Sequence, residues 1–145
     1  MANGSTTNNH ESALINAFVV RERKERLLYL VANPNRRKKF IDELGHFRWF
    51  DPRFATKAKW TTEHTVGLWD RHNEGIANIL RLLKSKGAGE TCWVISQFHD
   101  ADGREMQLGA ALEKIIGSGM GSILSCVPGR LAYFEGEDES LVLNR

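Results

Sequence analysis

The sequence of 145 residues is poor in cysteine: it has only Cys92 and Cys126, and neither begins a CxxC or CxxH spacing. A zinc ribbon or a thioredoxin-type site is therefore not expected. Both cysteines lie in apolar, strand-like runs, which predicts buried thiols rather than a disulfide. Unpaired cysteines of this kind are typical of a reducing compartment.

Long hydrophobic runs are also missing. No stretch approaches the roughly 20 apolar residues of a membrane-spanning helix, and the first residues, MANGSTTNNHES, lack the hydrophobic core of a signal peptide. We therefore expect a cytoplasmic protein with no membrane partner. Residues 1–12 are interpreted as a flexible leader. Residues 13–145 contain no repeat or evident linker and are interpreted as a single domain.

What the chain does contain is typical of a globular protein. Hydrophobic residues make up 41% of it and charged residues 26%, and the length allows a core without metal or disulfide support. Helical spacing of apolar residues predicts helices over 13–32, 34–47 and 73–86. The second helix has a clear start signal, because Asn33 can cap it and Pro34 fits its first position.

The second half of the chain changes to strand patterns. Strands are predicted over 91–98 and 104–107, with a short amphipathic helix at 108–117. Pro128 and Gly129, at the centre of a four-residue turn, predict a hairpin. We therefore predict an α+β fold, in which a helical N-terminal half precedes a small mixed or antiparallel sheet of β-β-α-β-β order. The expected core residues of the sheet are Val94, Ile95, Ile123, Val127, Leu131 and Phe134.

Charge is distributed unevenly along the chain, although the net charge is only +2. Eight cations lie within residues 21–39, and four acids lie within residues 135–139. Cations positioned by two neighbouring helices can bind a polyanion, with an affinity that falls steeply as salt increases. We call the eight cations the basic segment: Arg21, Arg23, Lys24, Arg26, Arg36, Arg37, Lys38 and Lys39.

The position of Arg36 and Arg37 is unusual, because the N-terminal end of a helix is the positive end of its macrodipole. One interpretation is that they bind an external anion, since helix N-termini accommodate phosphate. The other is structural. The two arginines cap the last carbonyls of the preceding helix, or the acids of 135–139 neutralise the basic segment. The sequence leaves both interpretations open.

Histidine and acidic residues provide weaker candidates for catalysis. His64, Asp70 and His72 lie in an aromatic stretch without a clear period, and they could supply a carboxylate–imidazole pair for a small hydrolase. Asp100 and Asp102, in HDADG, are weak candidates for a divalent metal ion, but the EF-hand pattern is absent and these residues suit a tight turn. We expect no metal site and no cofactor.

Two further motifs are set aside because of their context. The glycine-rich GSGMGS at 117–122 follows a predicted helix and precedes a predicted strand, which is the reverse of a phosphate-binding loop. Ser125 is not surrounded by the G-x-S-x-G pattern of a nucleophile elbow. Neither motif therefore predicts catalysis.

The sequence favours a non-enzymatic binding or regulatory protein whose basic segment engages an anionic partner. That partner could be nucleic acid, a nucleotide-like ligand or an acidic protein surface. The alternatives are the small hydrolase and a protein-interaction module anchored by Trp49, Trp60 and Trp69. A contiguous exposed patch of tryptophan would favour the interaction module.

Overall fold

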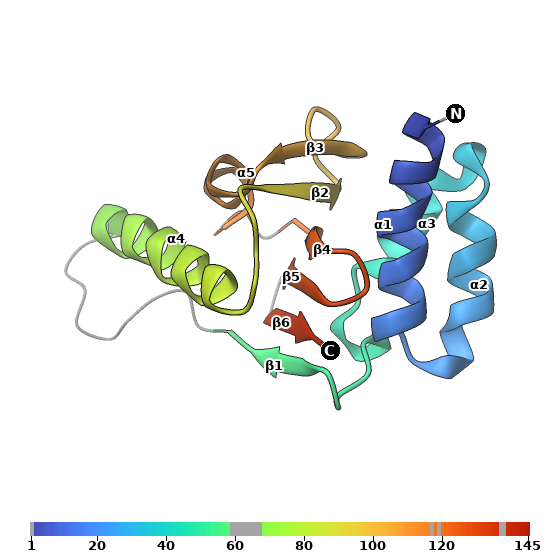
Figure 1. The fold of residues 1–145 in the computed structure, drawn as a ribbon, viewed down its shortest axis with the longest axis horizontal. Helices are drawn as coiled ribbons and strands as arrows, with labels where there is room; N and C mark the ends of the chain where they lie inside the picture. Colours follow the sequence, from blue (N-terminus) through green and yellow to red (C-terminus); the bar gives the residue numbers. More distant parts are fainter. Residues whose placement is uncertain (1, 59–67, 117, 119, 137–138) are drawn as a thin grey trace.

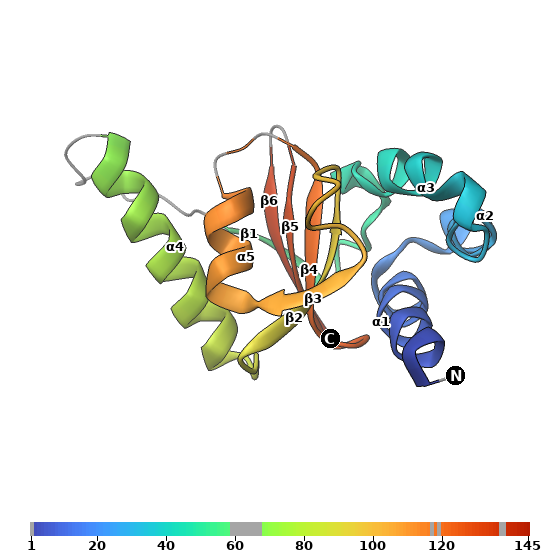
Figure 2. The same ribbon diagram turned by 90° about the horizontal axis from the view of Figure 1, so that it is seen from above.

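The computed structural model describes residues 2–58, 68–116, 118, 120–136 and 139–145. Within these residues, an antiparallel sheet of six strands separates two helical layers (Figure 1 and Figure 2). One layer consists of α1 (Ala2–Phe18), α2 (Arg21–Val31) and α3 (Arg37–Leu44). The other consists of α4 (Leu68–Ser85) and α5 (Leu108–Ile115). The predicted α+β class, with helices before strands, is confirmed.

The strand order in the sheet is β1-β6-β5-β4-β2-β3. Every pairing is antiparallel, so the sheet is not mixed. The edge strands are the shortest, and the four inner strands are buried between the helical layers. In chain order the strands are β1 (Ala55–Lys57), β2 (Thr91–Ser96), β3 (Arg104–Gln107), β4 (Ser122–Val127), β5 (Leu131–Glu135) and β6 (Ser140–Asn144).

The predicted hairpin joins β4 to β5. Gly129 has a φ of 69°, as the third residue of a type II turn requires, and the backbone N–H of Arg130 donates to the carbonyl of Val127 at 3.0 Å. The predicted β-β-α-β-β order corresponds to β2, β3, α5, β4 and β5. The prediction missed β1 and β6. β6 shows no alternation of apolar and polar residues, because Leu141, Val142 and Leu143 are all buried.

The first helix differs from its prediction at both ends. α1 begins at Ala2, so residues 2–12, interpreted from the sequence as a flexible leader, are helical. The predicted helix over 13–32 is interrupted after Phe18, although no glycine or proline lies there. The interruption is a tertiary effect: Val19 forms an isolated bridge with Phe50, and the N–H of Val20 donates to the carbonyl of Trp49 at 2.8 Å.

The start signal at Asn33 and Pro34 is confirmed. The side chain of Asn33 accepts a hydrogen bond of 3.3 Å from the N–H of Asn35, and Pro34 begins the 3-10 turn η1 (Pro34–Arg36), which leads into α3. The helix predicted over 34–47 ends earlier, at Leu44, and the short turn η2 (Phe47–Trp49) follows. The helix predicted over 73–86 begins earlier, at Leu68.

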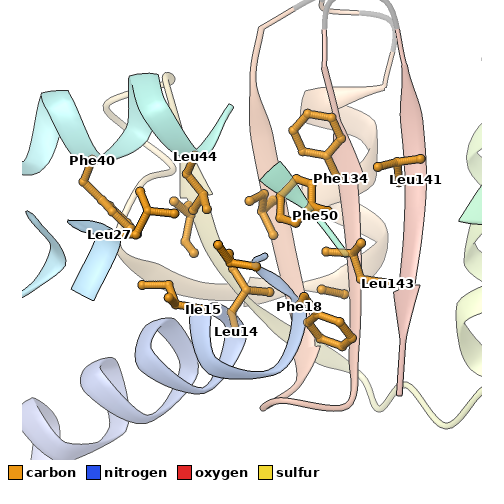
Figure 3. Close-up of a cluster of buried hydrophobic side chains, with 14 of the residues drawn as sticks. Leu14, Ile15, Phe18, Leu27, Phe40, Leu44, Phe50, Phe134, Leu141 and Leu143 are labelled. Atoms are coloured by element: carbon orange, nitrogen blue, oxygen red, sulfur yellow. The ribbon is translucent and has the colours of Figure 1, made fainter. Parts of the chain in front are cut away.

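Each face of the sheet carries its own hydrophobic cluster. On the face of α1 to α3, one cluster includes Phe18, Phe40, Phe50 and Phe134, with Phe50 next to Phe134 of β5 and Phe40 next to Leu27 (Figure 3). On the face of α4 and α5, the cluster includes Tyr133. Of the predicted core residues, only Val127 is half-buried, and the others are buried: Val94, Ile95, Ile123, Leu131 and Phe134.

The prediction of buried, unbridged cysteines is confirmed. Cys92 and Cys126 both lie in the cluster on the α4 and α5 face, and burial raises the pKa of each thiol to about 12. Thiols with such pKa values are almost entirely protonated at neutral pH, so they are poor nucleophiles.

Among the described helices, none combines the length and the apolar character that a membrane span needs.

Candidate functional site

Arg37 is the most extensively bonded cation of the basic segment. Its Nη1 and Nη2 donate to the two carboxylate oxygens of Glu11, at 2.6 and 2.8 Å. Its Nε and Nη2 donate to the two oxygens of Asp102, at 3.0 and 2.8 Å. Arg37 therefore joins three distant parts of the fold, namely α1, α3 and the turn between β2 and β3.

Both carboxylates that bind Arg37 have additional donors. Glu11 is only 2% exposed and also accepts from the indole N–H of Trp93 at 2.9 Å. Asp102 also accepts from the backbone N–H of Ser96 at 3.0 Å. Burial by itself lowers the pKa of Arg37, but the hydrogen bonds that Arg37 donates to Asp102 and Glu11 outweigh it and raise the pKa above its ordinary value. Arg37 is therefore a permanently charged structural link.

This arrangement differs from both interpretations of Arg36 and Arg37. Arg37 reaches two carboxylates rather than the last carbonyls of α2, and its donors are largely used inside the protein. Arg36 is exposed, and its side chain makes no hydrogen bond or ion pair with another described residue. The two neighbouring arginines therefore have different roles, and only Arg36 presents its charge to the outside.

The two aspartates considered for a metal ion both face cations. Asp102 is bonded to Arg37, and the carboxylate of Asp100 lies 2.6 Å from the Nζ of Lys114. The hydrogen bond from Lys114 lowers the pKa of Asp100. In the described part of the chain, no group of three or more His, Cys, Asp or Glu side chains is arranged to hold a metal ion.

Helix α2, the turn η1 and helix α3 carry the rest of the basic segment, in which Lys24 is half-buried and Lys38 faces the cleft beside α3. We call the solvent-accessible side chains of these three elements the α2–α3 surface; in both ribbon views α2 and α3 lie across the sheet from α4 (Figure 1 and Figure 2). Arg26 of α2 donates through Nε and Nη2 to the two oxygens of Glu43 of α3, both at 2.8 Å. The hydrogen bond from Arg26 lowers the pKa of Glu43, and the charges of Arg26, Lys39 and Arg23 lower it further. Three cations therefore surround one carboxylate where the two helices meet.

An aromatic ring supports one of these cations. The guanidinium of Arg23 lies over the ring of Trp49, with 3.8 Å between its central carbon and the ring centroid. Cation–π contacts of this kind hold the guanidinium without neutralising its charge. Five further cations of the basic segment form no ion pair with any described residue: Arg21, Lys24, Arg36, Lys38 and Lys39.

The two described acids of the segment 135–139 both have partners in the sheet. Glu135 is buried and accepts hydrogen bonds from the hydroxyls of Tyr133 and Ser140, while Glu139 lies 3.3 Å from the Nζ of Lys57. Residues 137 and 138 lie outside the described residues. Among the described residues, Glu139 therefore pairs with Lys57 of β1 rather than with a cation of the basic segment.

A cleft of about 700 Å³ lies beside the N-terminal turn of α3, opposite the turn between β2 and β3. The ion pair of Arg37 and Asp102 contributes to its wall, and Lys38 and Asp42 lie along the α3 side. His99 lines the opposite side. Cations and carboxylates are balanced in this lining, so the cleft has no marked preference for an anion.

The remaining candidates from the sequence receive less support. His64 and Trp60 lie outside the described residues, and the side chains of Asp70, His72 and Trp69 on α4 are not described either. Trp49 is half-buried beneath Arg23, and Trp93 is 8% exposed. The described tryptophans therefore form no exposed patch.

A Ser–His contact is present that the sequence did not predict. The Nδ1 of His10 lies 2.9 Å from the Oγ of Ser125, and the His10 ring stacks on Trp93 with 5.9 Å between ring centroids. Ser125 is 0% exposed, so its hydroxyl has no access to a substrate. The contact secures α1 to the sheet and is not a catalytic dyad.

Sequence reasoning missed Glu11 and His10, because both lie in a polar stretch interpreted as a leader. One signal was present: Trp93 lies in a predicted buried strand, and a buried indole N–H requires an acceptor. The partner of that N–H could not be identified, because 82 residues separate Trp93 from Glu11.

Comparison of the chain with protein-family models, with curated proteins and with solved structures found no match to any of them.

Proposed function

We propose that this chain is a non-enzymatic, cytoplasmic binding module that engages a polyanion through its α2–α3 surface. The observation that carries the proposal is the set of cations on this surface without a carboxylate partner among the described residues: Arg21, Lys24, Arg36, Lys38 and Lys39. A cation at a helix N-terminus is unfavourable by itself, so Arg36 at the start of α3 is better explained by an external anion than by local stability.

The proposal is specific about which cations take part. Arg37 is excluded, because Glu11 and Asp102 already occupy most of its donors. Arg26 takes part with the donors that Glu43 leaves free. The exposed carboxylates Glu22 and Glu25 of α2 oppose binding, so the anion is expected to lie toward α3.

The other two hypotheses from the sequence have less in their favour. A hydrolase built on His64, Asp70 and His72 has no described geometry that would support it. Of the three tryptophans expected to anchor a protein-interaction module, Trp49 is half-buried beneath Arg23, and the side chains of Trp60 and Trp69 are not described. The cations of the α2–α3 surface therefore favour the polyanion.

A salt titration with matched charge variants tests the proposal. Binding of heparin, nucleic acid and polyphosphate would be measured by fluorescence anisotropy as salt increases. The double variant Arg36→Gln/Lys39→Gln should bind more weakly. For single-stranded nucleic acid, the logarithm of the binding constant falls linearly with the logarithm of the salt concentration. The magnitude of this slope should be smaller by about 1.4 in the variant, which is about 0.7 for each of the two phosphates that it no longer neutralises.

The matched control removes two positive charges elsewhere, by Lys86→Gln/Arg130→Gln. Both residues are exposed and lie beside a different pocket, away from α2 and α3. This variant has the same net charge as the first and should keep the wild-type slope. Equal losses in the two variants would show that only net charge matters, and the proposal would be wrong. Absence of binding at low salt would also contradict it.

A further inference from the structure

The α2–α3 surface also presents an exposed aromatic ring. Tyr29 of α2 is 57% exposed, the most of any large hydrophobic side chain in the described part of the chain. The other such residue, Leu82, is 36% exposed and lies on α4. Tyr29 follows Glu25 by four residues and Arg26 by three on α2, so its ring has one carboxylate and one cation as neighbours. Arg26 is the neighbour on the side of α3, where it pairs with Glu43.

Arg26 is held in place with donors to spare. A guanidinium has five N–H donors, and Glu43 accepts two of them, from Nε and Nη2. The remaining donors, together with the ammonium of Lys39, which precedes Glu43 by four residues on α3, can bind phosphate oxygens next to the Tyr29 ring. An ordered cation beside an exposed aromatic ring is the pairing that single-stranded nucleic acid requires, because its phosphates need charge and its bases need a flat surface.

The contact between Arg23 and Trp49 adds a second pairing of a cation with a flat group to the α2–α3 surface. Arg23 lies over Trp49, which leaves the opposite side of the guanidinium facing away from the ring. Guanidinium planes can stack on bases as aromatic rings do. Arg23 and Tyr29 therefore lie on either side of Arg26 along α2, and each offers a flat group.

We infer that the α2–α3 surface binds single-stranded nucleic acid, with a base stacked on Tyr29 and the adjacent phosphates bound by Arg26 and Lys39. This inference rests on the proposed function and narrows its partner. In a duplex the bases are already stacked on one another, so Tyr29 would have no free base to contact. An acidic protein surface or polyphosphate supplies charge but no base.

The test compares substitutions of Tyr29 across three probes: labelled oligo(dT), a duplex of the same length, and polyphosphate of matched charge. Tyr29→Ala should weaken oligo(dT) binding about 5- to 150-fold, which corresponds to about 1–3 kcal/mol for one stacked base. Its binding to polyphosphate should be unchanged, because that probe has no base. Tyr29→Phe keeps the ring and should retain nearly all of the affinity for oligo(dT). Leu82→Ala removes the other exposed large apolar side chain, on α4, and should bind all three probes like the wild type.

The outcomes separate this inference from the proposed function. If Tyr29→Ala binds oligo(dT) as tightly as the wild type does, or if the wild type binds the duplex or polyphosphate as tightly as oligo(dT), the inference is wrong. If the wild type still binds polyphosphate in that case, the proposed function of polyanion binding keeps its support. If no probe binds the wild type at low salt, the proposed function and the inference both fail.

Discussion

The indole N–H of Trp93 donates a 2.9 Å hydrogen bond to a carboxylate oxygen of Glu11, and this bond joins β2 to α1 across 82 residues. The same carboxylate binds two nitrogens of Arg37. Glu11 therefore connects the sheet, the first helix and the helix that supports the α2–α3 surface. Its loss should affect all three.

Replacing Glu11 by alanine should destabilise the protein strongly, because Arg37 and the Trp93 indole would lose a buried acceptor. Breaking a buried ion pair costs about 3–5 kcal/mol, and because Asp102 still faces Arg37 we expect about 3 kcal/mol. Urea denaturation measures the change. Glu43→Ala, which breaks the exposed pair with Arg26, should have little effect, since surface pairs contribute little. Equal losses in the two variants would contradict the structural role of Glu11.

Arg36 and Arg37 should respond in opposite directions to alanine. Arg37→Ala leaves Glu11 and Asp102 with their charges uncompensated and should cost about 3 kcal/mol or more. Arg36→Ala removes an exposed cation from the start of α3, so at low salt it should leave stability unchanged or raise it by a few tenths to about 1 kcal/mol. Paired denaturant melts distinguish the two. A destabilised Arg36→Ala would show that its charge is needed by the fold.

His10 should make stability depend on pH. Burial lowers the pKa of His10 below its ordinary value of 6.5, and the nearby carboxylates Glu105 and Glu11 only partly oppose this. The unfolded chain therefore binds the proton more readily, so the free energy of unfolding should decrease as pH falls from 6.5 toward the folded pKa. His10→Gln should reduce this decrease. Melts at closely spaced pH values provide the measurement, and an unchanged profile in the variant would assign the effect to another group.

The hairpin turn should tolerate only glycine at position 129. Gly129 has a φ of 69°, and an added Cβ would lie 3.5 Å from the Cβ of Ala13. Gly129→Ala should therefore cost about 1–2 kcal/mol, the penalty of a left-handed backbone for an L-residue. Gly109 in α5 is the matched control, because an added Cβ there meets nothing within 4 Å. Gly109→Ala should be neutral or stabilising by about 0.5–1 kcal/mol in a thermal melt.

Removing acidic charge from α2 should strengthen polyanion binding. Glu22 and Glu25 are exposed among the cations of the basic segment, so each repels a bound phosphate. The variant Glu22→Gln/Glu25→Gln should bind oligo(dT) more tightly at low salt, and the gain should disappear as salt increases. Glu90→Gln/Glu113→Gln, at exposed positions outside the N-terminal helices, is the control. A larger gain in the control would place the binding surface elsewhere.

The sequence predicted those features that depend on neighbouring residues. Asn33 with Pro34 marked the start of a helix, and Pro128 with Gly129 marked a hairpin, because both signals act within a few residues. The break after Phe18 could not be predicted, since it depends on Phe50 and Trp49.

The role of Arg37 was beyond prediction for a similar reason. Its charge is visible in the sequence, but its partners lie 26 and 65 residues away. A local pattern shows that a cation is present and cannot show which carboxylate it meets. β6 was also missed, and its central residues Leu141, Val142 and Leu143 are all buried, so it shows no alternation of apolar and polar residues.

The pairing of β1 with β6 has a consequence for the order in which the protein folds during synthesis. Ala55 pairs with Leu143, so the β1 edge of the sheet cannot form until residues 140–144 have left the ribosome. Until then, β5 is an open edge, and such edges are prone to pair with other chains. Contacts between such distant residues also form slowly, because a long loop must close first. The nascent chain is therefore most exposed to misassembly just before β6 is added.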